Sequence, residues 1–258
     1  MVTSAWQQFE DELAHWRDAG LPVEFWWRDD DARQPDPALR RLLAQADTHR
    51  VPLALAVIPE GVQAAAFESA SDMVCVVQHG VDHINRAAVG EKETEFPAGE
   101  ALSVLLARLL QGHAQLEALQ GVRHVPVLVP PWNRISARQL PGELATVGYR
   151  GLSRFGARRS RTEVAGLGSV NTHVGIIDWH GTPGFAGEDF VLAQATRHLH
   201  MRRTGLADSS EPTGWLTHHA VHDEPAWAFM DRLFELTRAR PGIRWLAASE
   251  LFARPEPA

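Results

Sequence analysis

Two short segments carry the residues best suited to chemistry. Residues 25–31 read Phe-Trp-Trp-Arg-Asp-Asp-Asp, so an apolar run ends in the carboxylates of Asp29, Asp30 and Asp31. Further along, His79 and His83 are spaced as His-x-x-x-His. Adjacent like charges repel one another unless solvent or a bound cation stabilises them. Two imidazoles and one carboxylate are a familiar ligand set for catalytic zinc, so the two segments together predict a divalent metal site.

Each segment also has a simpler interpretation. The acidic triplet could be a solvated loop that leads into a helix, because residues 35–37 read Pro-Asp-Pro. The histidine pair could arise by chance among 13 histidines, and its imidazoles share one face only if residues 80–83 begin a helical turn. An acidic strand end and a histidine pair at a second strand end favour the metal site over either alternative.

The elements that must position these residues alternate along the chain. We expect strands near residues 22–28, 51–58, 73–77, 125–129, 149–152, 174–177, 214–216 and 243–246. We expect helices near residues 4–19, 37–49, 62–69, 98–120, 136–147, 187–203, 224–239 and 248–253. This alternation predicts parallel strands with crossover helices. Polar motifs follow five of the strands, and a closed barrel would gather them at one mouth. The expected fold is therefore one α/β domain over residues 1–258, a distorted (β/α) barrel of seven or eight strands.

The overall composition excludes some classes of protein. The chain has 258 residues, of which 45% are hydrophobic, and a net charge of -7. Without a basic excess, nucleic acid and anionic membranes are poor candidate partners. The first residues lack the pattern of a signal peptide and no apolar stretch has membrane length, so the sequence predicts a cytoplasmic location. Cys75 lies in an apolar strand and is expected to be buried.

Tryptophan and histidine are both frequent, with nine and 13 residues. Trp6 and Trp16 are expected in the core, whereas four tryptophans near polar motifs suit either a pocket or the core: Trp27, Trp132, Trp179 and Trp215. Outside the motifs, the following histidines are expected at the surface: His15, His49, His113, His124, His173, His198 and His200.

The ordered motifs resemble those of the polysaccharide deacetylase (NodB-homology) family over about residues 22–252. The acidic segment resembles the family's Phe-Asp-Asp-Gly-like motif, which puts Asp29 in the place of the catalytic base and Asp30 in that of a metal ligand. The second family motif is His-x-x-x-His. The resemblance thus implies a divalent cofactor, with Zn²⁺ expected, on Asp30, His79 and His83.

Three later segments continue the resemblance. Residues 129–133 partly resemble the motif Arg-x-Pro-aromatic-Gly, residues 178–179 match an Asp-Trp pair, and residues 216–218 match Leu-x-His. The resemblance implies that His218 protonates the leaving amine and that the charge of Asp178 keeps His218 protonated. Substrate contacts are expected from Trp132, Trp179, Leu216, Pro131 and Arg134.

The sequence departs from the family pattern at several positions. Asp31 stands where the family has glycine, and Asn133 replaces another glycine. Val129 stands where the family has the arginine that braces the catalytic base. Either Arg28 or Arg134 could supply that cation, and either His218 or the adjacent His219 could face the pocket.

The resemblance implies a metal-dependent hydrolase that removes an acyl group, expected to be N-acetyl, from a sugar or small amide. The expected partner is a small-molecule or oligosaccharide substrate, and the oligomeric state stays open. The lack of an export signal argues against cell-wall polymers. Two alternatives remain: a hydrolase of other non-peptide C–N bonds, such as those of cyclic amides, and a non-catalytic carbohydrate-binding barrel.

Overall fold

The computed structural model describes residues 3–119 and 122–253. The end of the helix expected over residues 98–120 lies outside this part of the chain, as do residues 255–258, which the sequence predicts to be a frayed tail. Among the described residues, none of the helices has both the length and the apolar character needed to cross a membrane.

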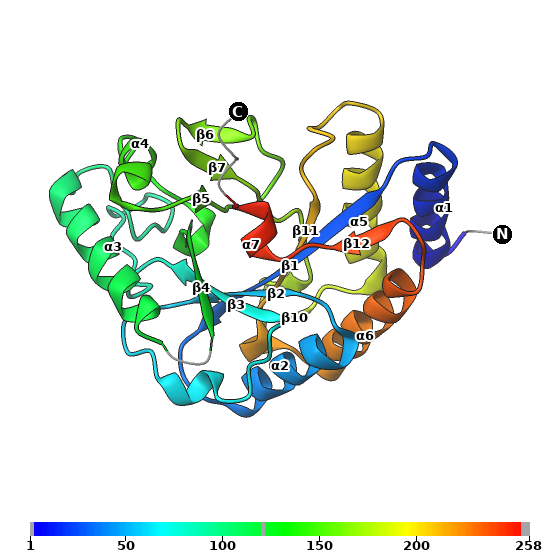
Figure 1. Cartoon of the computed structure of the whole chain (residues 1–258), viewed down its shortest axis with the longest axis horizontal. Coiled ribbons are helices and arrows are strands. Elements are labelled where there is room, and N and C mark those ends of the chain that lie inside the picture. Colours follow the sequence, from blue (N-terminus) through cyan, green and yellow to red (C-terminus); the bar gives the residue numbers. More distant parts are fainter. Residues whose placement is uncertain (1–2, 120–121, 254–258) are drawn as a thin grey trace.

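A curled, mostly parallel sheet forms the centre of the molecule (Figure 1). Its strand order is β6-β7-β5-β4-β3-β2-β1-β11-β8, and β12 also pairs with β1. The strands are β1 (Val23–Ala32), β2 (Leu53–Val57), β3 (Val74–His79), β4 (Arg123–Val129), β5 (Gly151–Leu152), β6 (Thr162–Val164), β7 (Leu167–Ser169), β8 (Val174–Gly175), β11 (Thr213–Thr217) and β12 (Ile243–Trp245).

One bridge closes this sheet into a ring. Phe155, just after β5, pairs in parallel with Thr172, just before β8. The Thr172 N–H donates to the Arg154 carbonyl, and the Gly156 N–H donates to the Thr172 carbonyl. Because β8 pairs with β11 and β11 with β1, the ring contains β1, β2, β3, β4, β5, β8 and β11. The predicted distorted (β/α) barrel is confirmed.

Helices cover the outside of the sheet, with α3 and α1 at opposite ends of the view in Figure 1. Ser4 caps the first helix by accepting from the Gln7 N–H, and Asp36 caps the second through the Leu39 N–H. The α-helices are α1 (Ala5–Asp18), α2 (Pro37–His49), α3 (Leu102–Glu117), α4 (Leu140–Leu144), α5 (Glu188–Arg203), α6 (Glu224–Arg238) and α7 (Ala248–Leu251). Short 3₁₀ helices are η1 (Ala64–Phe67), η2 (Pro131–Asn133), η3 (Ala145–Val147) and η4 (His219–Val221).

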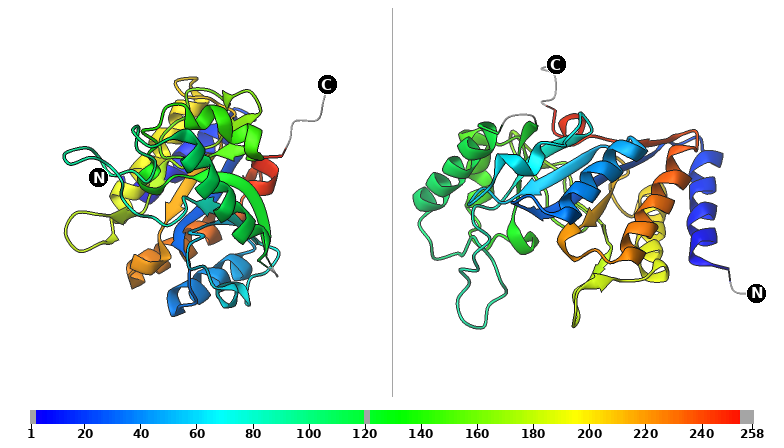
Figure 2. Two further views of the ribbon diagram at one scale, coloured as in Figure 1. Left: turned by 90° about the vertical axis from the view of Figure 1, so that its left-hand side faces the viewer. Right: turned by 90° about the horizontal axis from the view of Figure 1, so that it is seen from below.

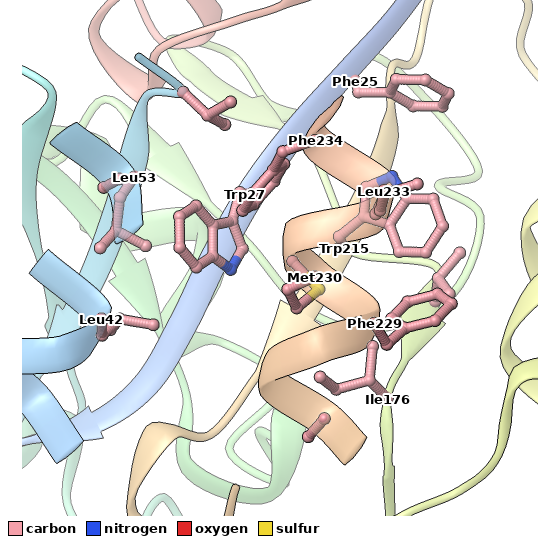
Figure 3. Packing of buried hydrophobic residues seen from close by; sticks show 14 of the residues in the cluster. Phe25, Trp27, Leu42, Leu53, Ile176, Trp215, Phe229, Met230, Leu233 and Phe234 are labelled. Carbon is pink, nitrogen blue, oxygen red and sulfur yellow. The ribbon is translucent and has the colours of Figure 1, made fainter. Parts of the chain in front are cut away.

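A large aromatic and aliphatic core packs α2 and α6 against the outside of β1 (Figure 3). Trp27 lies in this core between Leu53 and Phe234, and its Nε1–H donates to Thr217 Oγ1 at 2.9 Å. Trp215 is also fully buried there. These two tryptophans therefore belong to the core and not to a pocket. The core positions predicted for Trp6 and Trp16 are confirmed.

Several local expectations differ from the structure. β1 continues to Ala32, so the acidic triplet lies inside the strand and not in a loop after it. Residues 80–83 contain a bend at Val81 and Asp82 instead of a helical turn. The β6–β7 hairpin and the small β9 (Ile177–Asp178) and β10 (Gly184–Phe185) pair were not predicted, because strands of two or three residues carry almost no periodic signal. Cys75 is buried as expected, and burial raises the pKa of its thiol to about 12.

Candidate active site

A cavity of about 770 Å³ opens at the carboxyl ends of the barrel strands. Figure 2 shows two segments that project on this side of the molecule, the loop between β3 and α3 and the β9–β10 hairpin. Glu93 of that loop and Trp179 in the turn of the hairpin line the cavity. Residues from the predicted site that also line it are Asp30, His79, His83, Trp132, Arg134, Leu216 and His218.

The carboxylate that meets the two histidines is that of Asp31. Asp31 Oδ1 lies 3.0 Å from His79 Nε2 and 3.4 Å from His83 Nε2. Donor atoms of these three residues all lie within 4.8 Å of one another. The sequence predicted Asp30 at this position. The structure has Asp31 there, which is the next residue of the strand.

A bulge in β1 explains this shift. Successive side chains of a regular strand point to opposite faces. The ladder between β1 and β2 is irregular between Asp29 and Ala32, and Asp31 adopts φ 75°, in the left-handed region. The bulge re-aims the chain, so that the neighbouring residues Asp30 and Asp31 both line the cavity.

The cluster of Asp31, His79 and His83 fits a divalent cation. His79 Nδ1 lies 3.0 Å from the Val129 carbonyl, so its N–H donates there and the Nε2 lone pair faces Asp31. Asp31 Oδ1 is buried and has no hydrogen-bond partner among the described residues. Burial opposes ionisation of Asp31, but the nearby imidazole of His79, with those of His218 and His83, holds the pKa of that carboxyl well below its usual range. A carboxylate beside two imidazole nitrogens is a donor set that suits zinc.

Glu95 holds the loop that carries His83. The buried Glu95 carboxylate accepts the backbone N–H groups of Val81 at 2.8 Å, Asp82 at 3.3 Å and His83 at 3.3 Å. Burial, with the nearby charge of Asp82, raises the pKa of Glu95 to about 7. Glu95 was missed by sequence reasoning, since it lies in a polar loop without a motif.

Gly80 is the point where this loop turns, and Gly80→Ala should destabilise the protein. Gly80 has φ 57°, and a Cβ there would lie 2.1 Å from Glu95 Oε2 and 2.6 Å from Pro131 Cγ. Overpacking of this kind costs about 1–3 kcal/mol in the free energy of unfolding. Urea denaturation would measure the loss. Gly90→Ala is the matched control, because Gly90 also has a positive φ, of 87°, but nothing lies within 4 Å of its added Cβ. Equal losses in both variants would show that backbone strain, and not the contact with Glu95, constrains Gly80.

Arg28 holds the carboxylate of Asp30. Arg28 Nε donates to Asp30 Oδ1 at 2.8 Å, and Nη2 donates to Asp30 Oδ2 at 3.0 Å. The same guanidinium donates to Ser153 Oγ at 2.7 Å and to Asn133 Oδ1 at 3.0 Å. Of the two candidate cations, Arg28 is therefore the one that braces the buried Asp30 carboxylate beside the histidines. Arg134 lies at the cavity wall and pairs with Glu93 at 3.3 Å.

Asp29, expected as the catalytic base, points elsewhere. Its Oδ2 accepts from Thr217 Oγ1 at 2.6 Å and from the His219 N–H at 2.9 Å, while Oδ1 lies 2.5 Å from His219 Nδ1. Burial opposes ionisation of Asp29, but the charge and hydrogen bond of His219 lower the pKa of this carboxyl. Asp29 thus ties β1 to the end of β11, outside the residues that line the cavity.

His218 and His219 have separate places. His218 lines the cavity, with its ring 4.8 Å from the ring of Trp179. His219 is buried against Asp29. Asp178 is exposed, and its Oδ1 accepts from the His180 N–H at 2.8 Å. Ile177 is buried and precedes Asp178 in β9, so the alternation of the strand turns the Asp178 side chain outward. The predicted pair between Asp178 and His218 is absent from the hydrogen bonds and ion pairs of the described residues.

Comparison with known proteins identifies the fold. No family model matches the chain, and neither does any curated protein. Among solved structures, a putative polysaccharide deacetylase from Mycobacterium smegmatis matches with a TM-score of 0.58 at 16% identity, over 89% of both chains. A peptidoglycan N-acetylglucosamine deacetylase matches with a TM-score of 0.56 at 14% identity, over 90% of this chain and 89% of the other. A family 4 acetyl xylan esterase from Clostridium thermocellum, in complex with a cobalt ion, matches with a TM-score of 0.52 at 14% identity, over 89% and 90%. The chain has the polysaccharide deacetylase fold.

Within this deacetylase fold, the remaining predicted contact residues divide into two groups. Trp132, Trp179 and Leu216 line the cavity, and the Trp132 ring lies 4.4 Å from the ring of His83. Pro131 is buried behind the loop at Gly80 and lies outside the cavity lining. Pro131 therefore supports the histidine loop instead of forming the cavity wall.

Proposed function

We propose that this protein is a metal-dependent deacetylase that removes an acetyl group from an acetylated sugar. The observation that carries the proposal is the meeting of Asp31, His79 and His83 next to Asp30, which Arg28 holds in a buried ion pair. This arrangement lies in a cavity at the carboxyl ends of the barrel strands, where such barrels keep their active sites. The structural relatives, which include deacetylases and an acetyl xylan esterase, support the same reaction class.

Asp31, His79 and His83 are the proposed ligands of one divalent ion, and Zn²⁺ suits two imidazoles and a carboxylate. The assignment based on the sequence thus moves by one residue, with Asp31 in place of Asp30 as ligand and Asp30 in place of Asp29 as base. When bound, the ion would polarise the acyl carbonyl and lower the pKa of a water molecule.

Residues of the protein carry out the other steps of the reaction. Asp30 accepts the proton of the attacking water, and Arg28 orients its carboxylate. The backbone N–H of Trp132 would stabilise the developing oxyanion, a contribution of about 3 kcal/mol for one donor in well-studied enzymes. His218, which also lines the cavity, donates a proton to the leaving group. Asp178 has no part in this scheme, because it is exposed and accepts from the His180 N–H.

Aromatic side chains at the cavity suit a small-molecule or oligosaccharide substrate. Phe155, Trp179 and Phe190 line the cavity and are 45%, 54% and 60% exposed. Flat apolar rings of this kind can pack against the apolar faces of sugar rings. The Asp30–Arg28 pair argues against a non-catalytic binding barrel, because sugar binding alone needs no braced base beside a metal site. A cytoplasmic location stays a prediction.

The proposed function can be tested with a substrate screen. The protein, loaded with Zn²⁺ or Co²⁺, would be incubated with N-acetylated sugars, O-acetylated sugars and cyclic amides. Release of acetate from the sugars is the expected result. Ring opening of cyclic amides without acetate release would establish the alternative C–N hydrolase. Turnover of none of these by a metal-loaded protein would contradict the proposal.

The two adjacent histidines give a separate prediction. His218→Gln should lower kcat about a hundredfold or more, the usual range for a positioned acid, and leave the fold unchanged. His219→Gln should chiefly lower the free energy of unfolding, by about 3–5 kcal/mol, because Asp29 would lose its buried partner. Steady-state kinetics and urea denaturation of both variants would separate the two effects. A folded His219→Gln variant without activity, beside an active His218→Gln variant, would assign the acid to His219.

A further inference from the structure

A second cluster of metal-binding side chains lies at the far end of the sheet from the cavity. His113 and Glu117 stand one turn apart on α3, and His124 is the second residue of β4. One donor atom from each residue lies within 4.8 Å of the other two. Both histidines were expected at the surface, but the structure places them between helix and sheet, only partly exposed.

We propose that His113, Glu117 and His124 bind a second divalent transition-metal ion, such as Zn²⁺ or Ni²⁺. His113 Nε2 lies 3.3 Å from Glu117 Oε1, on the same face of α3. The rings of His113 and His124 lie 4.8 Å apart at 68° to each other, an arrangement that lets nitrogens of two rings approach one point. Two imidazoles and one carboxylate bind such ions and leave positions for water.

The surroundings of the His113, Glu117 and His124 side chains favour a cation. His124 Nε2 and His113 Nδ1 are buried and have no hydrogen-bond partner among residues 3–119 and 122–253. The Glu117 carboxylate supplies negative charge. Its side chain is 62% exposed, so an ion can reach the cluster from solvent.

A third cluster, His173, His198 and Glu211, differs in that it is fully buried. Its imidazoles stack 3.6 Å apart at 15°. Glu211 already accepts the backbone N–H groups of Arg158 and Asn171, both at 2.9 Å. Of these two clusters, the one formed by His113, Glu117 and His124 is therefore the one whose carboxylate is open to solvent.

The proposed ion would join α3 to β4 at the start of the strand. His79 binds the Val129 carbonyl at the other end of β4, and seven strand residues span roughly 20 Å. An ion at His124 is therefore too far from the cavity to take part in chemistry. Its expected effect is to stabilise the connection between α3 and β4.

Zinc binding measured by equilibrium dialysis and metal analysis would test the second site. Wild type should bind two Zn²⁺ ions per chain, and Asp31→Asn should bind one. Adding Glu117→Gln to Asp31→Asn should weaken that remaining site at least tenfold and abolish the rise in Tm that Zn²⁺ causes. His113→Gln in the same background should do likewise, which guards against a folding defect in one variant.

The matched control is His15→Gln. His15 is also a helix histidine beside a glutamate, but that residue, Glu12, is held by Arg203 at 2.8 Å. Unchanged zinc binding in this control, with loss in the Glu117 and His113 variants, would support the proposal. The proposal would be overturned if the Asp31→Asn variant bound no zinc. It would also be overturned if zinc binding by Asp31→Asn were unchanged after Glu117→Gln and after His113→Gln. Neither result depends on whether the cavity is catalytic.

Discussion

Asp31→Asn should remove the divalent ion from the cavity and reduce turnover to background, whereas Asp30→Asn should keep the ion. The reason is the position of each carboxylate: Asp31 Oδ1 faces the Nε2 atoms of His79 and His83, while both oxygens of Asp30 accept from Arg28. As the proposed base, Asp30 contributes about 10²- to 10⁴-fold to the rate. Metal analysis and kcat/KM of the two purified variants would measure both effects.

Asp72→Asn serves as the control for this pair, since Asp72 is exposed and outside the cavity lining. It should retain the ion and full turnover. Loss of the ion in Asp30→Asn, with retention in Asp31→Asn, would restore the assignment made from the sequence. Loss of turnover in Asp31→Asn with the ion still bound would leave Asp31 with a role other than ligand.

Arg28→Met should lower the free energy of unfolding by about 3–5 kcal/mol and abolish turnover. Arg28 is fully buried, and its removal leaves the Asp30 carboxylate as an uncompensated buried charge. It also removes the donors to Ser153 and Asn133, which join β1 to the segments after β5 and β4. Urea denaturation and kinetic assays would record the two losses.

A double variant shows whether the ion pair itself is responsible. Arg28→Met with Asp30→Asn should be more stable than the sum of the single losses predicts, because the unpaired charge is gone. Arg134→Met is the matched control: Arg134 is 41% exposed in its pair with Glu93, and its loss should change stability by less than about 1 kcal/mol. Additive losses in the double variant would contradict a direct coupling between Arg28 and Asp30.

Much of the fold could be predicted because it depends on local patterns. The apolar faces and caps of α1, α2 and α6 mark each helix, and buried apolar runs mark β1 to β4. The helices expected at residues 62–69 and 136–147 were less accurate. The first is the 3₁₀ helix η1, and the second is divided between α4 and η3, with Pro141 in the first turn of α4.

The candidate site was predicted less completely than the fold. The sequence by itself determined which residue types could meet: an acidic triplet at the end of β1, the histidine pair after β3 and a histidine after β11. Parallel strands bring those ends to one edge of a barrel, so proximity followed from the order of elements.

Only the tertiary structure decided what each of these residues does. Asp29, Asp30 and Asp31 are chemically identical, and a shift of one residue reverses the face of a strand. Pairing of β1 with β2 and β11 creates the bulge and sends Asp29 to His219, Asp30 to Arg28 and Asp31 to His79. The same holds for Glu95, whose three backbone bonds depend on a loop turned by Gly80. Such contacts join residues distant in sequence, and no local pattern of residue types can specify them.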